Sequence, residues 1–431
     1  MKPIIYLFIV VLTLSTGCRN SQSQGTLGTT LTKEAPSTVG MSRERLQKIE
    51  AMLQEAVDSQ EIPGAVALIV RKGGVVMHES FGLADHASQK EMTADAIFRI
   101  ASQSKAITAT AVMMLWEEGK FRLDDPISKY IPEFKNPQVL ETFNEADSSY
   151  TTMAADKEIS IRHLLTHTSG IGYGVIDGDE RIRKIYAKAG ITDLYTTENI
   201  SIEENIKKLA SLPLHHNPGE DFTYSEGLDV LGYFIEIISG MPFNAYLRTY
   251  LFDPLGMDDT WFYLPDDKAD RLVTVQKPGD NTWERYPVTF YDTDYPIKGA
   301  KRFFSGGAGL CSTAKDYAVF LQMYLNGGSY GGVRLLSPTS IRSIMGEQMD
   351  IPLGKSGYYY GLAFGMVSPK GQNLGGVGSA GSFDWGGYFN TQYFADPEEE
   401  VIGVLMKQTQ GAQNDNTGWK FRQMTFAAIE K

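Results

Sequence analysis

A serine and a lysine three residues apart, Ser102 and Lys105, are the side chains in this sequence best placed to do chemistry. An apolar run over 106–116 follows them and has the length and composition of a helix. A serine at the first turn of a helix lies in the positive field of the helix N-terminus, where backbone N–H groups lack intrahelical partners. Residues three apart share one helix face, so the lysine amine can reach the serine hydroxyl and accept its proton. The pair therefore predicts a nucleophilic serine.

The same Ser-x-x-Lys pattern occurs a second time, from Ser312 to Lys315, and again precedes an apolar run. For either copy taken alone, the simpler interpretation is a serine that caps a helix, followed by a surface lysine. The pattern by itself therefore leaves two candidate serines, and the rest of the chain has to decide between them.

Strands are expected near both ends of the chain and helices between them. Apolar residues at helical spacing predict an amphipathic helix over 42–59, and the apolar runs 65–71 and 75–81 flank a Lys-Gly-Gly hairpin signal. Further strands are expected over 358–366, 385–394 and 401–406, and a helix over 417–429. This order predicts an α+β fold: an antiparallel sheet built from both chain ends, flanked by the N- and C-terminal helices, with a mainly helical subdomain inserted at about 118–300.

Several stretches occur in an order that resembles a known family. After Ser102 the chain carries a Tyr-Ser-Glu stretch at Tyr224 and a Trp-Gly-Gly stretch at Trp385. Supporting stretches lie at Ile161 to Gly170, Ser305 to Gly309 and Asp396-Pro397. Across residues 41–431 the ordered set resembles the serine hydrolases related to class C β-lactamases, which include low-molecular-weight penicillin-binding proteins and family VIII carboxylesterases. The resemblance implies a β-lactamase/transpeptidase-like fold.

The resemblance also assigns roles and selects the first serine, because the family's nucleophile precedes its tyrosine motif. It implies that Ser102 attacks a carbonyl carbon and that Lys105 and Tyr224 activate it and move the proton. Which of the two is the base stays open, since coupled groups titrate together. The resemblance further implies that Trp385, Gly386 and Gly387 line the cleft, and that the N–H groups of Ser102 and Tyr388 form the oxyanion hole. Ser312 is then expected to cap a structural helix.

Two departures from the family pattern bear on the substrate. Glu226 stands where the family has an asparagine in the cleft, and an ionised glutamate cannot donate a hydrogen bond to a substrate carbonyl. Trp385 stands where β-lactamases have a lysine that would bind a substrate carboxylate. Both changes weaken a β-lactam interpretation, and Trp-Gly-Gly resembles the esterase branch.

The sequence therefore predicts a serine hydrolase that forms an acyl-enzyme, with small carboxylic esters as the leading substrates and amides as related ones. The alternative enzyme is a β-lactamase or a D-Ala-D-Ala carboxypeptidase, and acyl transfer in place of hydrolysis stays open. A different class is a non-catalytic envelope protein that keeps the fold as a binding module or sensor. The oligomeric state is not predicted.

Other partners are excluded by charge and context. The net charge of −12 argues against nucleic acid. Gly376 to Gly381 fits G-x-G-x-x-G, but a strand-like run follows it where a dinucleotide site needs a helix. His163 and His167 lack the glutamate of a zinc-binding helix, so neither a metal nor a cofactor is expected. Cys311 lies in an apolar context that predicts a core residue.

The N-terminus has the pattern of a bacterial lipoprotein signal. Residues 4–14 form an apolar stretch too short to span a bilayer, and small residues precede Cys18. We predict a signal peptide over 1–17, a lipidated Cys18, a flexible tether over 18–40 and a hydrolase domain over 41–431. The protein is then expected in the bacterial cell envelope, held on the membrane by its lipid and facing the periplasm or the exterior.

Overall fold

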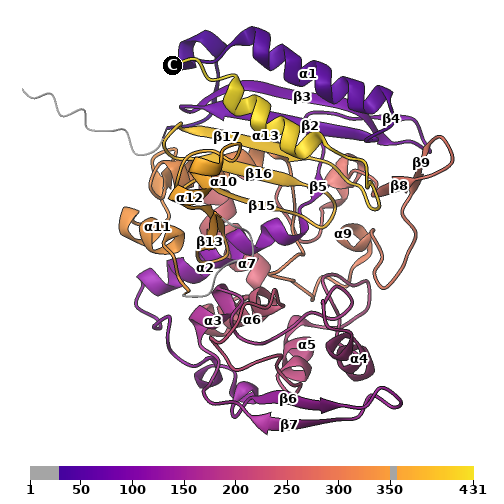
Figure 1. Cartoon of the computed structure of the whole chain (residues 1–431), viewed down its shortest axis with the longest axis vertical. Coiled ribbons are helices and arrows are strands. Elements are labelled where there is room, and N and C mark those ends of the chain that lie inside the picture. The colour runs from indigo at the N-terminus through magenta and orange to yellow at the C-terminus, as the bar shows by residue number, and fades with distance from the viewer. Residues whose placement is uncertain (1–28, 350–356) are drawn as a thin grey trace, which may run out of the picture.

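The computed structural model describes residues 29–349 and 357–431 and has an α+β fold built on a nine-stranded sheet (Figure 1). The strand order is β1-β3-β2-β17-β16-β15-β14-β13, with β4 paired to β3. The strands are β1 (Thr32–Lys33), β2 (Gly64–Arg71), β3 (Gly74–Asp85), β4 (Lys90–Glu91), β13 (Tyr358–Tyr360), β14 (Gly365–Val367), β15 (Phe383–Gly386), β16 (Gln392–Asp396) and β17 (Val401–Met406). Strands from both chain ends thus meet where β2 pairs with β17, as the sequence predicts.

The helices lie on both sides of this sheet and in a separate half of the molecule (Figure 1). They are α1 (Arg43–Asp58), α2 (Ser104–Glu117), α3 (Ile161–Leu165), α4 (Glu180–Ala189), α5 (Ile202–Leu209), α6 (Gly227–Ser239), α7 (Phe243–Leu247), α8 (Asp253–Leu255), α9 (Tyr295–Lys298), α10 (Ala314–Leu325), α11 (Pro338–Met345), α12 (Pro369–Leu374) and α13 (Thr417–Ala427). The small sheets pair β5 (Phe98–Arg99) with β10 (Cys311–Ser312), β6 (Gln138–Phe143) with β7 (Tyr150–Ala154), β8 (Gln276–Pro278) with β9 (Trp283–Arg285), and β11 (Ser329–Tyr330) with β12 (Val333–Arg334).

Strand β2 shows how the sheet is held between two apolar layers. All of its residues are buried, and they alternate between two cores. The even-numbered residues from Val66 to Val70 belong to the larger core, which includes α2 and α10, and the odd-numbered residues from Ala65 to Ile69 pack in the core of α1 and α13. Because successive side chains of a strand point to opposite faces, one continuous apolar run serves both layers.

The elements with strong local signals are confirmed. The helix predicted over 42–59 is α1, and the predicted hairpin joins β2 to β3 through Lys72 and Gly73, whose φ angles are 51° and 78°. Two successive residues with positive φ are what a tight two-residue hairpin turn requires. The strand predicted over 401–406 is β17, and the C-terminal helix is α13.

Two predicted strands are instead hairpins. Residues 358–366 contain β13 and β14 around a turn in which Ala363 has a φ of 66°, and residues 385–394 contain parts of β15 and β16. Phe364 and Phe389 lie in these two turns and are fully buried. The apolar pattern therefore continues through each turn, so the sequence gives no break there.

Residues 29–40, which the sequence assigns to a tether, are packed on the domain. The sequence predicted an antiparallel sheet. Strand β1 runs parallel to β3, so the sheet is mixed at this edge. The Arg71 guanidinium donates to the carbonyl oxygens of Val39 (3.2 Å) and Gly40 (2.7 Å). The C-terminal part of the predicted tether therefore contacts the domain through β1 and the Arg71 guanidinium.

The predicted signal peptide and the lipidation residue Cys18 lie outside the described residues. Within the described residues no single helix is long and apolar enough to cross a membrane, although the bent pair Gly227–Ser239 and Phe243–Leu255 reaches the required length and composition when taken together.

The second Ser-x-x-Lys copy begins in a strand, not at a helix cap. Ser312 is fully buried at the end of β10, where its hydroxyl is hydrogen-bonded to that of Thr260 (2.8 Å). Thr313 caps α10 instead, because its hydroxyl accepts the N–H of Asp316 at 3.1 Å. The predicted cap is thus wrong by one residue, since pairing with β5 holds Ser312 in extended backbone. Cys311, beside it, is a fully buried core residue as predicted.

Candidate active site

Ser102 lies in a strained turn between β5 and α2. The α-helix begins only at Ser104, and residues Ala101–Gln103 form a short 3-10 turn before it. Ala101 has a φ of 44°, a left-handed conformation that costs a non-glycine residue roughly 1–2 kcal/mol. Its methyl group is buried in an aromatic cluster that includes Tyr173, which holds the strained residue in place. The turn leaves Ser102 partly exposed although its neighbours on both sides are buried.

Lys105 is buried beside Ser102 and its amine has three partners. The Nζ atom is 2.8 Å from the Tyr173 hydroxyl, 2.8 Å from the Gly307 carbonyl oxygen and 3.4 Å from the Ser102 hydroxyl. Among the described residues no carboxylate forms an ion pair with it. The Gly307 oxygen can only accept, whereas either hydroxyl can donate or accept. The amine is thus held by Gly307 and Tyr173 within reach of the Ser102 hydroxyl, which is the position that a base for the serine proton needs.

The Tyr224 ring covers Lys105 and its hydroxyl points toward Trp385. The lysine Nζ lies 4.6 Å from the ring centroid, and the Trp385 indole donates to the Tyr224 hydroxyl at 3.4 Å. Among the described residues this hydroxyl bonds to neither Ser102 nor Lys105. Catalytic hydrogen bonds are often long before substrate binds, so this geometry is compatible with proton transfer in a complex.

The His167 ring packs against the Tyr224 ring. The two ring centroids are 4.5 Å apart, and the His167 Nδ1 accepts the N–H of Ser225 at 3.1 Å. Burial, together with the positive charge of Lys105, lowers the pKa of His167 well below its usual value. A neutral ring can accept at Nδ1, so this histidine fixes the backbone that carries Tyr224.

Tyr173 is a site residue that the sequence reasoning missed. It is 1% exposed, and burial, followed by the neighbouring Tyr224 and Asp229, raises its pKa well above the usual value. It therefore stays a neutral hydroxyl beside Lys105. The only sequence signal was its place three residues after the stretch that ends at Gly170.

Glu226 does not lie in the cleft as predicted. Its side chain is 1% exposed and is absent from the cleft lining, because its backbone N–H donates to Gly172 and turns the residue into the interior. Burial, together with the negative charge of Asp193, raises the pKa of Glu226 well above its usual value. The predicted effect of Glu226 on a substrate carbonyl in the cleft is therefore wrong.

The hairpin after β15 approaches the turn that carries Ser102. A Cβ atom on Gly387 would lie 2.5 Å from the Ile100 carbonyl oxygen, so only glycine fits at this close approach. The next residue, Tyr388, has a backbone N–H that donates to no acceptor among the described residues. The structure thus places this unpaired donor on the hairpin that contacts the Ser102 turn.

A cleft of about 910 Å³ opens at Ser102 and reaches the C-terminal helix. The predicted Tyr224, Trp385, Gly386 and Gly387 line it. The other main lining residues were not predicted from the sequence; they are Phe222, Tyr358, Asp384, Gln392, Trp419, Arg422 and Gln423.

The charged residues of this cleft neutralise each other. The Arg422 guanidinium on α13 lies 2.6 Å from a carboxylate oxygen of Asp384 on β15. Tyr358 adds its hydroxyl to the same carboxylate at 3.2 Å. No other charged residue lines the cleft among the described residues, so its surface is uncharged apart from one internal ion pair.

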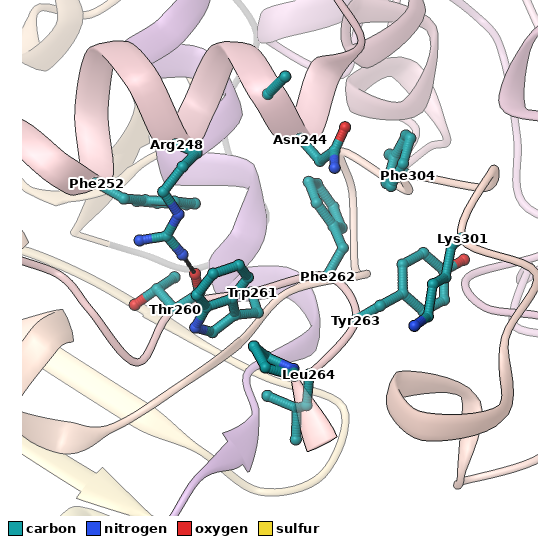
Figure 2. Close-up of a pocket in the computed structure, with 12 residues that line it drawn as sticks. Asn244, Arg248, Phe252, Thr260, Trp261, Phe262, Tyr263, Leu264, Lys301 and Phe304 are labelled. Atoms are coloured by element: carbon teal, nitrogen blue, oxygen red, sulfur yellow. Dashed lines mark hydrogen bonds between the residues drawn. The ribbon is translucent and has the colours of Figure 1, made fainter. Parts of the chain in front are cut away.

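A second, smaller cavity of about 340 Å³ shares no lining residue with the cleft (Figure 2). It lies between the helical segment from Asn244 to Phe252 and the strand-like run before Pro265, and Arg248 stacks on Trp261 at 3.8 Å. Lys301 lines this cavity, so it is not a cation of the cleft. Nor do the described residues contain a group of three or more His, Cys, Asp or Glu side chains that could hold a metal ion.

Comparisons with known proteins find relatives that match most of the chain. The Beta-lactamase family model matches residues 49–424. Esterase EstB of Burkholderia gladioli is 30% identical over 381 residues, covering 84% of this chain and 90% of EstB. A putative D-alanyl-D-alanine carboxypeptidase of Escherichia coli (strain K12) is 29% identical over 397 residues, covering 87% of this chain and 85% of that protein. The solved structure of EstCE1, a hydrolase with promiscuous acyltransferase activity, has a TM-score of 0.73 at 26% identity and covers 90% of this chain and 99% of its own.

Exposure separates the two candidate serines in a labelling experiment. We expect Ser102→Ala to abolish labelling by a fluorophosphonate probe, because Ser102 alone of the pair faces the cleft and a lysine amine. Ser312→Ala should label like the wild type, since Ser312 is fully buried and bonded to Thr260. Labelling is read by gel fluorescence and peptide mass spectrometry. Undiminished labelling of Ser102→Ala would reject Ser102 as the nucleophile.

Proposed function

The chain belongs to the Beta-lactamase family of serine hydrolases, and on that premise we propose that it hydrolyses small carboxylic esters through an acyl-enzyme on Ser102. The observation that carries the proposal is the buried amine of Lys105, which can accept the Ser102 proton while its N–H groups bond to Gly307 and Tyr173. A serine hydroxyl needs such an adjacent base to become a nucleophile.

The proposed reaction has two steps. The Ser102 oxygen attacks the ester carbonyl carbon while its proton passes to Lys105, and the carbonyl oxygen becomes an oxyanion. The N–H groups of Ser102 and Tyr388 donate to that oxygen, the kind of contact whose loss costs about 10²–10³ in rate. The C–O bond to the alcohol then breaks and the alcohol takes the proton. Water repeats the sequence on the acyl-enzyme and releases the acid.

Tyr224 is proposed to carry the proton on the side of the leaving group. Its hydroxyl lies at the cleft, bonded to the Trp385 indole, whereas Lys105 contacts Ser102 directly. The Lys105 Nζ lies 4.6 Å from the centroid of the Tyr224 ring, so the two groups are neighbours in the site. The two residues then act as one proton-transfer unit.

The cleft supports uncharged esters as substrates. Among the described residues that line it, the charged ones are Asp384 and Arg422, which are paired, and the Trp385 ring offers apolar surface in the cleft that contains Ser102. EstB carries the name esterase and EstCE1 is described as a hydrolase with acyltransferase activity, which supports ester chemistry and leaves transfer to an alcohol as a related outcome.

A carboxylate-bearing substrate, such as a β-lactam or a D-Ala-D-Ala peptide, is the second candidate. One observation favours it: Arg422 is a cation in the cleft, and the Escherichia coli relative is named a putative D-alanyl-D-alanine carboxypeptidase. The carboxylate of Asp384 already neutralises this arginine at 2.6 Å, which is why we rank the ester first.

We also propose that the protein is anchored in the bacterial cell envelope through Cys18. The proposal rests on the sequence alone, on the short apolar stretch 4–14 and the small residues before the cysteine.

The proposed proton-transfer unit can be tested with two variants. Lys105→Ala and Tyr224→Phe should each lower kcat for a nitrophenyl ester by about 10² or more, the usual scale of general acid–base terms. If the two act as a unit, the double variant should be little slower than either single one. Tyr263→Phe is a matched control, because it removes a partly buried tyrosine hydroxyl that is bonded to the Phe303 carbonyl outside the cleft. Losses that multiply in full would show that the two residues act independently.

Substrate choice can be tested by parallel turnover of a short-chain nitrophenyl ester, a chromogenic cephalosporin and a D-Ala-D-Ala peptide. We expect kcat/KM to be highest for the ester. Trp385→Lys should raise the cephalosporin-to-ester ratio by one to two decades, since a charge-assisted hydrogen bond contributes roughly 1.5–3 kcal/mol. Trp385→Phe controls for loss of the indole bond to Tyr224 and should leave the ratio near its wild-type value. Efficient cephalosporin turnover with no activity on esters would contradict the proposal.

Membrane attachment is tested by cell fractionation. The wild-type protein should sediment with membranes and resist salt extraction, since two or more acyl chains give stable attachment. Cys18→Ala should release the protein or leave an uncleaved precursor. A soluble, processed wild-type protein would show that the anchor is absent.

A further inference from the structure

Four residues that follow β17, Lys407 to Gln410, bond to both segments that would build the oxyanion hole. We propose that this segment, named here the 407–410 clamp, sets the separation between the N–H groups of Ser102 and Tyr388. The inference rests on the proposed function, because it assigns positioning residues to that same reaction.

The two donors have no strand pairing in common. Among the described residues, Ser102 follows β5, whose strand partner is β10, whereas Tyr388 follows β15, whose partners are β14 and β16. An oxyanion hole works only when both donors lie about 2.7–3.1 Å from the same developing charge. Some other part of the chain must therefore hold β5 and the hairpin after β15 at a fixed distance from each other.

Gln408 holds the nucleophile side of the clamp. Its Oε1 accepts the backbone N–H of Arg99 at 3.1 Å, and its Nε2 donates to the Arg99 carbonyl oxygen at 3.0 Å. The same amide accepts from the Arg99 guanidinium at 3.2 Å and donates to the Lys407 carbonyl at 3.0 Å. The Gln408 side chain thus pairs with the backbone of Arg99, three residues before Ser102, as a neighbouring strand would. Gln408 is 1% exposed.

Thr409 and Gln410 hold the hairpin side. The Thr409 N–H donates to the Phe389 carbonyl at 3.1 Å, and the Gln410 amide donates to the Tyr388 carbonyl at 2.5 Å. Asn390, in the same hairpin and with a φ of 72°, donates to the Thr409 hydroxyl at 3.1 Å. Two successive carbonyls and one side chain therefore fix the two peptide planes that directly follow the Tyr388 donor.

A buried ion pair forms the base of the clamp. Lys407 and Asp415 contact each other with side chains 1% and 3% exposed, and the Asn390 amide donates to the same carboxylate at 2.6 Å. A buried ion pair adds little net stability compared with apolar packing, but removing one partner leaves a costly buried charge. A buried ion pair can instead hold neighbouring groups in one geometry. Here the group it holds is Asn390, in the hairpin after β15 that carries Tyr388.

The experiment compares Gln408→Ala and Asn390→Ala with the wild-type chain on a nitrophenyl ester and on its thionoester. Sulfur is a weaker hydrogen-bond acceptor than oxygen, so an intact oxyanion hole accelerates turnover of the carbonyl ester more than turnover of the thionoester. If the two donors lose their separation, this difference in turnover becomes smaller. We expect kcat on the carbonyl ester to fall about tenfold or more with a smaller change in KM, and the carbonyl-to-thiono ratio of kcat/KM to fall as well.

Gln322→Ala is the matched control. Gln322 is also a buried glutamine, 5% exposed, but it lies on α10 and bonds to the Asn326 side chain. This variant should lower the melting temperature without changing the carbonyl-to-thiono ratio. A purely structural role for Gln408 would give the same result as Gln322, namely a lower melting temperature with an unchanged ratio, and that outcome would overturn the inference.

Failure of the inference and failure of the proposed function are distinguishable. Ester turnover by the wild type that is lost in Ser102→Ala supports the function whatever the clamp variants do. If the wild type hydrolyses no ester, the rate of fluorophosphonate labelling replaces turnover, because the phosphonyl oxygen occupies the same donors. Labelling at the wild-type rate in both clamp variants would reject the clamp. If Gln408→Ala does not fold, Asn390→Ala, whose side chain is only partly buried, decides the question.

Discussion

The buried amine of Lys105 is the constraint on which the geometry of the site depends. An amine taken out of water must have its hydrogen bonds supplied by the protein. Its partners come from three separate parts of the chain: Ser102 just before α2, Tyr173 in the loop after α3, and Gly307 in the loop before β10. The helical half of the molecule and the segment that pairs with β5 must therefore both be in place before the site exists.

The sheet supplies the other side of the site with a second constraint. Because β2 is buried on both faces, the sheet is held between α2 and α10 on one side and α1 and α13 on the other. Helix α13 serves twice, since Phe421 packs in the core while Trp419 and Arg422 line the cleft. Stability of the sheet and the shape of the cleft are thus coupled through one helix.

The order and identity of Ser102, Lys105, Tyr224 and Trp385 could be predicted from the sequence, as could α1, the β2–β3 hairpin and β17. These features are local. Helical spacing, a turn that needs positive φ at Lys72 and Gly73, and short motifs in a fixed order are all written in consecutive residues. The α+β class follows from the same patterns because strands from both ends have to share one sheet.

Only the tertiary structure decided which side chains meet in the site. The local patterns around Tyr173, Arg422 and Gln408 are unremarkable, yet packing brings them to Lys105, the cleft and Arg99. Glu226 shows the converse, because the motif predicted a cleft residue and the fold buries it, which raises the pKa of its carboxyl group. The physical reason is the same in each case: burial and charge state depend on segments distant in the chain, and no local pattern records them.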